Sequence, residues 1–305
     1  MTTLAQGNRV QYVYDFATLE RVPEGPTSAK VAAKQLLSGP TLQTGKSSTI
    51  GAVLTGSNLI VALAGQARGS GAKAHTHPNE QINYIVQGVM TGEIEGELVF
   101  APSGTLLHTP AQAVHTGLAC PDEDLIFFAM KDTRHGIVGP PVDGKYDGPN
   151  YLPGFGTRSG ERMQSTAELM AASGRDPAGV KTRYVYDFAH PAEKPDRVSS
   201  AKVTPQVGPT SQSGATGALV TGETLHVALL RYPRDSGDQR QSHPNEQFTF
   251  VVEGAVRAEI GGEETLAGKH CVVHFPAGMP HRLTATGDGD ALVVTVQNTR
   301  YAFAG

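Results

Sequence analysis

Four residues in the amino-terminal half have the types and spacing of a metal-binding set. His75 and His77 form an HxH pair, Gln81 follows shortly after, and His115 stands after the turn-like segment 110–114. If residues 75, 77 and 81 lie on one strand, they share a parity and point to the same face. Three imidazoles and an amide are neutral N and O donors suited to a divalent transition metal: Fe, Mn, Ni, Co or Zn. Burying them without such a partner would be costly, so we predict a metal site at these four residues.

The glutamine affects the chemistry that this site would favour. Gln81 is neutral, so a bound metal would keep its full positive charge, whereas a glutamate ligand would cancel one unit. A more positive centre is a stronger Lewis acid, which favours polarising a carbonyl or carboxylate over redox chemistry with oxygen. Glu80 is adjacent, however, and a local bulge could present it in place of Gln81. The residues therefore favour isomerisation, elimination or hydration and leave redox chemistry open.

A second copy of the set lies in the carboxy-terminal half. Gln241, His243, Gln247 and His281 each follow their counterparts by 166 residues. This constant spacing indicates an internal repeat and hence two copies of one domain. Gln241 replaces the first histidine, and an amide oxygen is a poorer ligand than an imidazole. We therefore predict either a second, weaker metal site or a pocket satisfied by hydrogen bonds, with the first half as the working one.

Two further side chains near the set could carry protons. Tyr84 aligns with a phenylalanine of the second half, so its hydroxyl occurs only beside the complete set, and His108 precedes His115 by seven residues. Both are predicted as catalytic acids or bases. The alternatives are a simple hydrogen bond for Tyr84 and a satisfied core histidine for His108. Asn83 has the parity of Gln81 and is expected to line the same cavity.

Strands must position these residues. Short apolar or alternating runs separated by glycine-containing turns fill both halves, as in residues 51–63, 82–100 and 125–130. Closely spaced short strands with turn signals predict a sandwich or barrel. A run at residues 10–16 recurs at 183–188 with an offset of 172, which falls to 166 further on. The fall in offset means that the second copy has lost six residues in between. Because loops tolerate deletions most easily, residues 38–50 are expected to form a surface connection.

The repeat sets the predicted domain boundaries. The first domain is placed at residues 1–137, a linker rich in proline and glycine at 138–180, and the second domain at 181–305. Ser165 and Glu168 match a capping box, which predicts one short helix in the linker over residues 166–172. The linker also has apolar side chains that would prefer to dock on a domain: Tyr146, Tyr151, Leu152 and Phe155.

Composition excludes several classes of protein. The chain has 305 residues, with 36 glycines, 20 prolines, no tryptophan and a formal charge of −4 without basic clusters. This argues against a nucleic-acid partner. No apolar run approaches the length that spans a membrane, and the first residues lack the apolar region of a signal peptide. Two cysteines are too few for a disulfide framework. We therefore expect a cytoplasmic protein, and the sheet edges suggest a homodimer.

In its motifs the chain resembles the cupin superfamily. The first motif of that family is a glycine, an HxH pair, a carboxylate or amide and another glycine, here Gly69, His75, His77, Gln81 and Gly88. The second motif, PxGxxH, is matched by Pro276, Gly278 and His281, whereas the first repeat has Gln112 at the place of the glycine. The resemblance covers both repeats. It implies an all-β fold of two tandem double-stranded β-helix, or jelly-roll, domains: a bicupin.

The glutamine of the HPxEQ motif resembles two groups of cupins in particular. One is the bicupin isomerase that acts on a prephenate-derived acid in bacilysin biosynthesis, and the other is the small cupin that linearises unsaturated uronates. Both groups hold a divalent metal with three histidines and a glutamine. The resemblance carries those roles onto His75, His77, Gln81 and His115.

Three functions are compatible with these features. The leading hypothesis is a metal-dependent isomerase or lyase that acts on a small oxygen-rich substrate through its carbonyl, carboxylate or enolic oxygens. The second is a non-haem iron dioxygenase that cleaves a phenolic or diketone ring. The third is a non-catalytic cupin that binds a sugar or another small ligand. Metal content and oxygen uptake distinguish the first two, and fold analogy alone cannot.

Overall fold

A computed structural model describes residues 9–36, 48–152, 154–155, 163–174, 182–188 and 199–304. Most of the surface connection expected at residues 38–50 lies outside this part of the chain. Within it, no helix is long and apolar enough to cross a membrane.

Short strands dominate both halves. The first half contains β1 (Val13–Asp15), β2 (Lys30–Leu36), β3 (Ile50–Thr55), β4 (Leu59–Gln66), β5 (Ser70–His75), β6 (Gln81–Gln87), β7 (Val89–Ile94), β8 (Glu97–Pro102), β9 (Thr105–Thr109), β10 (His115–Ala119), β11 (Leu125–Asp132) and β12 (Asn150–Tyr151). The helix α1 (Thr166–Ala172) follows. The second half contains β13 (Val185–Asp187), β14 (Lys202–Val207), β15 (Thr216–Thr221), β16 (Leu225–Tyr232), β17 (Gln247–Glu253), β18 (Ala255–Ile260), β19 (Glu263–Gly268), β20 (Cys271–Phe275), β21 (His281–Thr286) and β22 (Ala291–Asn298).

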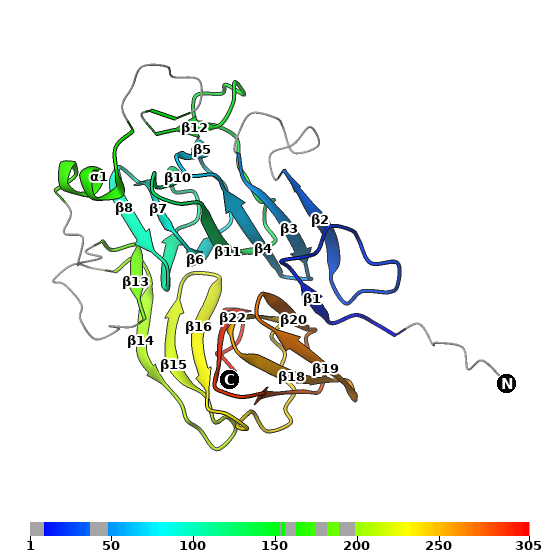
Figure 1. Cartoon of the computed structure of the whole chain (residues 1–305). Coiled ribbons are helices and arrows are strands. Elements are labelled where there is room, and N and C mark those ends of the chain that lie inside the picture. The colour runs from blue at the N-terminus through cyan, green and yellow to red at the C-terminus, as the bar shows by residue number, and fades with distance from the viewer. Residues whose placement is uncertain are drawn as a thin grey trace.

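Each half folds as two sheets that enclose a core (Figure 1). In the first half a seven-stranded sheet of order β13-β9-β6-β11-β4-β3-β2 faces a five-stranded sheet of order β12-β5-β10-β7-β8. In the second half a seven-stranded sheet of order β1-β20-β17-β22-β16-β15-β14 faces a three-stranded sheet of order β19-β18-β21. All the strand pairs of these sheets are antiparallel, as in a jelly roll. The all-β prediction is confirmed.

The burial pattern of the strands follows from what covers each sheet. In β17 the first six residues are all buried, because this strand belongs to a seven-stranded sheet with a core on both faces. In β18 burial alternates, with Val256, Ala258 and Ile260 inside, because its small sheet has one face toward solvent. Hydrophobic patterning in the sequence therefore reports the layer to which a strand belongs.

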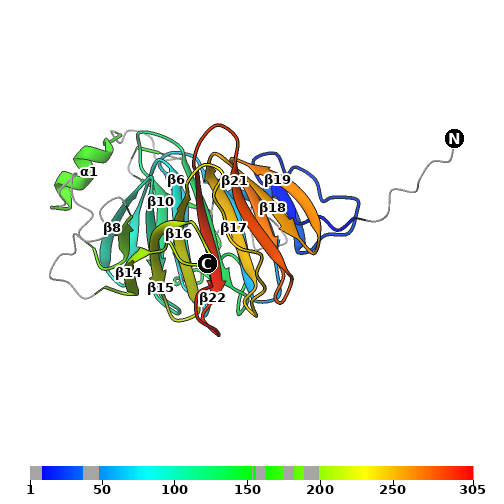
Figure 2. The ribbon, with the colours of Figure 1, turned by 90° about the horizontal axis from the view of Figure 1, so that it is seen from below.

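Three apolar cores result from this layering. One fills the space between the two sheets of the first half and a second does the same in the second half. The third lies between the two seven-stranded sheets and takes residues from both halves. At its centre the rings of Phe128 and Phe250 stack with their centroids 4.6 Å apart. The two halves are therefore joined by a core of their own, and Figure 2 shows the strands of the two halves side by side.

The first strand of each repeat pairs with the other half. β1 pairs with β20, with Val13 opposite Val273, and Figure 1 shows the blue β1 beside the orange β20. Reciprocally, β13 pairs with β9, with Val185 opposite Leu107. The boundaries at 137/138 and 180/181 stay predictions, but each large sheet contains one strand from the other half.

The linker is partly ordered on the first half. The predicted helix is confirmed as α1, with the capping box of Ser165 and Glu168 in place. β12 pairs with the edge of β5, and Leu152 N donates to Gly69 O at 2.8 Å. A Cβ added at Gly69 would lie 2.1 Å from the ring of Phe155, so this glycine is needed where the linker docks. The docking predicted for the apolar residues of the linker is confirmed for Tyr151, Leu152 and Phe155, whereas Tyr146 is 43% exposed.

Candidate metal centre

The three histidines of the predicted metal-binding set meet at one end of the core of the first half. His75 ends β5 and His115 begins β10, where the two are direct partners across the strands. The ring centroids of His75 and His115 are 4.2 Å apart, and that of His77 is 4.8 Å from His115. The ligand atoms of all three, which are buried, lie within 4.8 Å of one another.

The expectation that residues 75 to 81 form one strand was wrong. β5 ends at His75, β6 begins at Gln81, and residues 76–80 make a loop between them. Pro78 cannot donate to a strand ladder, and Asn79 donates its side-chain Nδ2 to Asp132 O at 2.9 Å, which fixes the loop. His77 therefore reaches the site from a loop rather than by strand alternation.

Backbone carbonyls fix the tautomer of each ring. The Nδ1 atom of His75 lies 2.7 Å from Lys73 O, that of His77 2.8 Å from Asn79 O, and that of His115 2.9 Å from Ala113 O. A carbonyl only accepts, so each Nδ1 carries the hydrogen and each Nε2 keeps its lone pair. Such contacts orient the histidine ligands of metals.

Burial keeps the three rings neutral. It lowers the pKa of His77 to about 3, with the nearby Lys131 adding to the effect. It lowers the pKa of His115 to about 4, although the hydrogen bond to Ala113 opposes this. Burial also depresses the pKa of His75, and His115 is the next cause. Neutral imidazoles are the form that binds metals.

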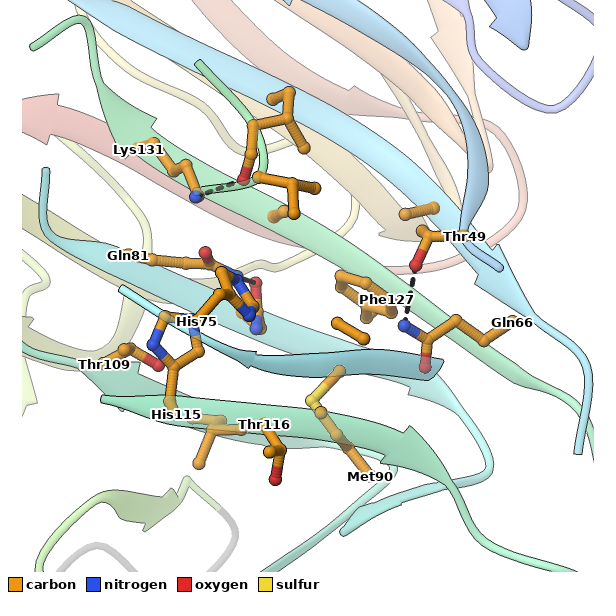
Figure 3. A pocket seen from close by; sticks show the side chains of 18 residues that line it. Thr49, Gln66, His75, Gln81, Met90, Thr109, His115, Thr116, Phe127 and Lys131 are labelled. Atoms are coloured by element: carbon orange, nitrogen blue, oxygen red, sulfur yellow. Dashed lines mark hydrogen bonds between the residues drawn. The ribbon is translucent and has the colours of Figure 1, made fainter. Parts of the chain in front are cut away.

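Gln81 and Asn83 line the same cavity, as Figure 3 shows for Gln81. Gln81 Nε2 donates to Asn83 Oδ1 at 2.8 Å, which leaves the amide oxygen of Gln81 as an acceptor. Three Nε2 lone pairs and this oxygen form the neutral N and O donor set of a divalent transition metal, so the residues present fit such an ion.

Sequence reasoning missed Lys131 in this site. It lies on β11, its side chain is 1% exposed, and its Nζ is 3.0 Å from His77 Nε2 and 2.5 Å from Ile137 O. Burial lowers its pKa to about 7. A metal bound to His77 would displace this contact. The available signal was the repeat itself, which sets Lys131 against the neutral Gln297.

The prediction of Tyr84 and His108 as catalytic residues needs correction. Both side chains lie on the opposite face of their sheet, because the cavity is lined by Gln81 and Asn83 of β6 and by Leu107 and Thr109 of β9. His108 Nε2 contacts Glu80 Oε1 at 2.7 Å and its Nδ1 contacts Ser200 Oγ at 2.8 Å, at the junction of the halves. Tyr84 packs in the core between the halves, where burial raises its pKa to about 12.

Glu80 does not present its carboxylate to the metal-binding set. Its oxygens accept from the backbone nitrogens of Glu223, Thr224 and Leu225 in the second half, at 2.8, 2.8 and 3.0 Å. The alternative in which a bulge exchanges Glu80 for Gln81 is therefore wrong.

The second half contains a reduced version of the site. His243 and His281 are buried with their centroids 4.7 Å apart, and Gln241 pairs with His281 as His75 does with His115. Gln247 Oε1, however, accepts from Gln297 Nε2 at 2.6 Å. His281 Nε2 is buried without a hydrogen-bond partner among the described residues. The weaker second metal site at Gln241, His243, Gln247 and His281 stays a prediction.

The comparisons with known proteins agree with the repeat. The cupin domain matches residues 62–131 and again residues 228–297, so this all-β chain contains two cupin jelly-roll domains, with one short helix between them in the part of the chain that the structure describes. No sequence among curated proteins matches the chain significantly.

Solved structures are similar in fold at low sequence identity. AerE from Microcystis aeruginosa has a TM-score of 0.55 and 12% identity, over 82% of this chain and 92% of that one. A variant of oxalate decarboxylase from Bacillus subtilis has a TM-score of 0.53 and 14% identity, over 97% and 79%. A variant of salicylate 1,2-dioxygenase from Pseudoaminobacter salicylatoxidans, in complex with gentisate, has a TM-score of 0.54 and 16% identity, over 98% and 84%. These similarities show a shared fold.

Proposed function

We propose that this chain with two cupin domains is a metal-dependent enzyme of isomerase or lyase type that acts on a small oxygen-rich substrate. The observation that carries the proposal is the convergence of the Nε2 atoms of His75, His77 and His115 beside the amide of Gln81. The glutamine-bearing motif, which resembles that of two isomerase-type cupin groups, supports the same reaction class.

The residues of the cavity would have two roles, metal binding and substrate binding. His75, His77, His115 and Gln81 would hold a divalent metal, which when bound supplies Lewis acidity toward a carbonyl, carboxylate or enolic oxygen. All four ligands are neutral, so they would leave its positive charge undiminished.

The rest of the cavity would orient the substrate and exclude water. Met90, Leu107 and Phe127 give it an apolar wall. The cavity has a volume of about 60 Å³, on a scale on which one water molecule needs about 10–15 Å³. It therefore suits a compact substrate, and electrostatic interactions with that substrate would be stronger beside this apolar wall than in bulk water.

Metal analysis of matched variants tests this proposal. Purified wild-type protein is expected to contain a divalent transition metal, His115→Ala to lose it, and the repeat mate His281→Ala to retain it, as measured by elemental mass spectrometry. Metal that remains in full after His115→Ala, with circular dichroism showing an intact fold, would contradict the proposal.

The reaction class is tested by turnover with and without oxygen. A panel of small hydroxy acids, keto acids and uronates should be converted under nitrogen by the metal-loaded protein and not by His115→Ala. Turnover of a phenolic or diketone substrate that consumes oxygen would favour the dioxygenase instead.

A further inference from the structure

Lys131 brings a positive charge into a cavity that has no negative one. None of the described side chains that line the cavity is a carboxylate. The neighbouring Asp132 turns its carboxylate away, to Arg134 Nε at 2.9 Å and Thr224 Oγ1 at 2.9 Å. A buried ammonium without a counter-charge is costly, and a bound metal would add further positive charge at the same place. A negatively charged ligand would balance both charges.

The charge of Lys131 is specific to the half that contains the cluster of His75, His77 and His115. In the second half the equivalent Gln297 is neutral, and its amide is committed to Gln247 Oε1 at 2.6 Å and Ala304 O at 2.6 Å. Lys131, in contrast, contacts His77 Nε2 and a single carbonyl, that of Ile137. An ammonium has three hydrogens to donate, so Lys131 has one left for a ligand. Figure 3 shows its Nζ on the side of the cavity that carries His75 and Gln81.

The far end of the cavity offers a different group. Gln66 is buried and donates its Nε2 to Thr49 Oγ1 at 2.7 Å, while its Oε1 has no hydrogen-bond partner among the described residues. Figure 3 shows Gln66 at the end opposite Lys131, with Phe127 between them. A buried carbonyl oxygen without a donor is unfavourable, so a ligand hydroxyl that donates there would be recognised.

We propose that Lys131 is a substrate-recognition residue that binds the carboxylate of a compact hydroxy acid, whose hydroxyl group donates to Gln66 Oε1. The apolar wall between the two groups would contact the short carbon chain of the acid. Because it names the substrate class of the same cavity, this inference rests on the proposed function.

Calorimetric titration with small probes tests the anion site directly. The probes are 4-hydroxybutyrate, butyrate and the neutral butyramide, each titrated into chelator-treated and zinc-loaded full-length protein. Wild-type protein is expected to bind butyrate about tenfold or more tighter than butyramide, as a charge-assisted hydrogen bond implies. Lys131→Met should abolish this preference, and the exposed Lys34→Met, which removes the same charge elsewhere, should leave it unchanged. A preference for butyrate that survives Lys131→Met overturns the proposal.

The hydroxyl group is tested with the same probes. Wild-type protein should bind 4-hydroxybutyrate several-fold tighter than butyrate, and Gln66→Met should remove that difference. Equal binding of the two acids by wild-type protein overturns the assignment of Gln66. Lys131→Gln introduces the side chain that the second half has at this position. If this folded variant also loses the preference for butyrate, the loss in Lys131→Met reflects the missing charge and not a disturbed fold.

The two zinc states separate this inference from the proposed function. If the protein binds no metal but chelator-treated protein still prefers butyrate through Lys131, the metal-dependent function fails and the anion site stands. If zinc binds at the histidines but Lys131→Met keeps the preference for butyrate, the anion site fails and the metal centre stands.

Discussion

Gln112 occupies a backbone conformation that side chains other than glycine rarely adopt. Its φ is +63°, and its repeat mate Gly278 has a φ of +73°. The turn is needed because Gln112 N donates to His77 O at 2.9 Å and Thr76 Oγ1 donates to Gln112 O at 2.8 Å. These bonds connect the turn before His115 to the loop that carries His77, so the geometry of the predicted metal-binding set depends on a strained residue.

The strain at this position predicts opposite effects in the two halves. Gln112→Gly should raise the free energy of unfolding by up to about 1 kcal/mol, because glycine adopts a positive φ without steric cost. Gly278→Ala should lower it by a similar amount, although a Cβ there would have nothing within 4 Å. Urea denaturation measures both. A loss of stability in Gln112→Gly would contradict the assignment of strain.

The sequence identified the histidines but not their surroundings. Residue type and the repeat were sufficient to identify His75, His77 and His115, because few structural roles other than metal binding bring three histidines together. Lys131 was missed because the sequence does not show that both faces of β11 are covered, and only this covering buries the lysine in the cavity. His108 was misassigned because a buried histidine would suit either the cavity or the junction between the halves. The chain alone does not say which of these faces a residue of β9 meets.

At the scale of elements, two buried glutamates join turns of opposite halves. Glu80 binds the turn that precedes β16, and Glu246 binds Ser57 N and Asn58 N of the turn that precedes β4, both at 2.7 Å. Burial raises the pKa of each carboxyl, but hydrogen bonds from His108 or His274 and from the backbone outweigh it, so each pKa is lowered overall. The charged form is therefore held by a histidine of the same half together with backbone donors that the other half supplies.

Glycines let these carboxylates approach the turns. A Cβ at Gly222 would lie 2.0 Å from Glu80 Oε1, and one at Gly56 would lie 2.1 Å from Glu246 Oε1. Gly222→Ala and Gly56→Ala should each reduce stability by about 1–3 kcal/mol or more, because the carboxylate must leave its donors. Gly25→Ala, where a Cβ meets nothing within 4 Å, is the control. Chemical denaturation curves that coincide for Gly222→Ala and Gly25→Ala would show that the junction tolerates the clash.

At the scale of the whole molecule, the strand exchange makes each half incomplete alone. β1 completes the large sheet of the second half and β13 that of the first. The sequence could not predict this exchange, because residues 12–16 and 184–188 are both Tyr-Val-Tyr-Asp-Phe and would suit the edge of either sheet. Tyr14 and Tyr186 also join the same core between the halves. Only the path of the folded chain distinguishes the two pairings.

Proline substitutions in the exchanged strands separate the two pairings. Tyr14→Pro removes a strand N–H from β1 and should increase amide hydrogen exchange by about tenfold or more in β20, its partner in the second half, while β9 stays protected. Tyr186→Pro should do the reverse, exposing β9 and sparing β20. Because the two substitutions remove equivalent tyrosine contacts in the core, the two variants should be destabilised globally to a similar extent. Hydrogen exchange followed by mass spectrometry of peptides that cover β9 and β20 gives the comparison. Faster exchange of β9 in Tyr14→Pro would mean that each domain completes its own sheet.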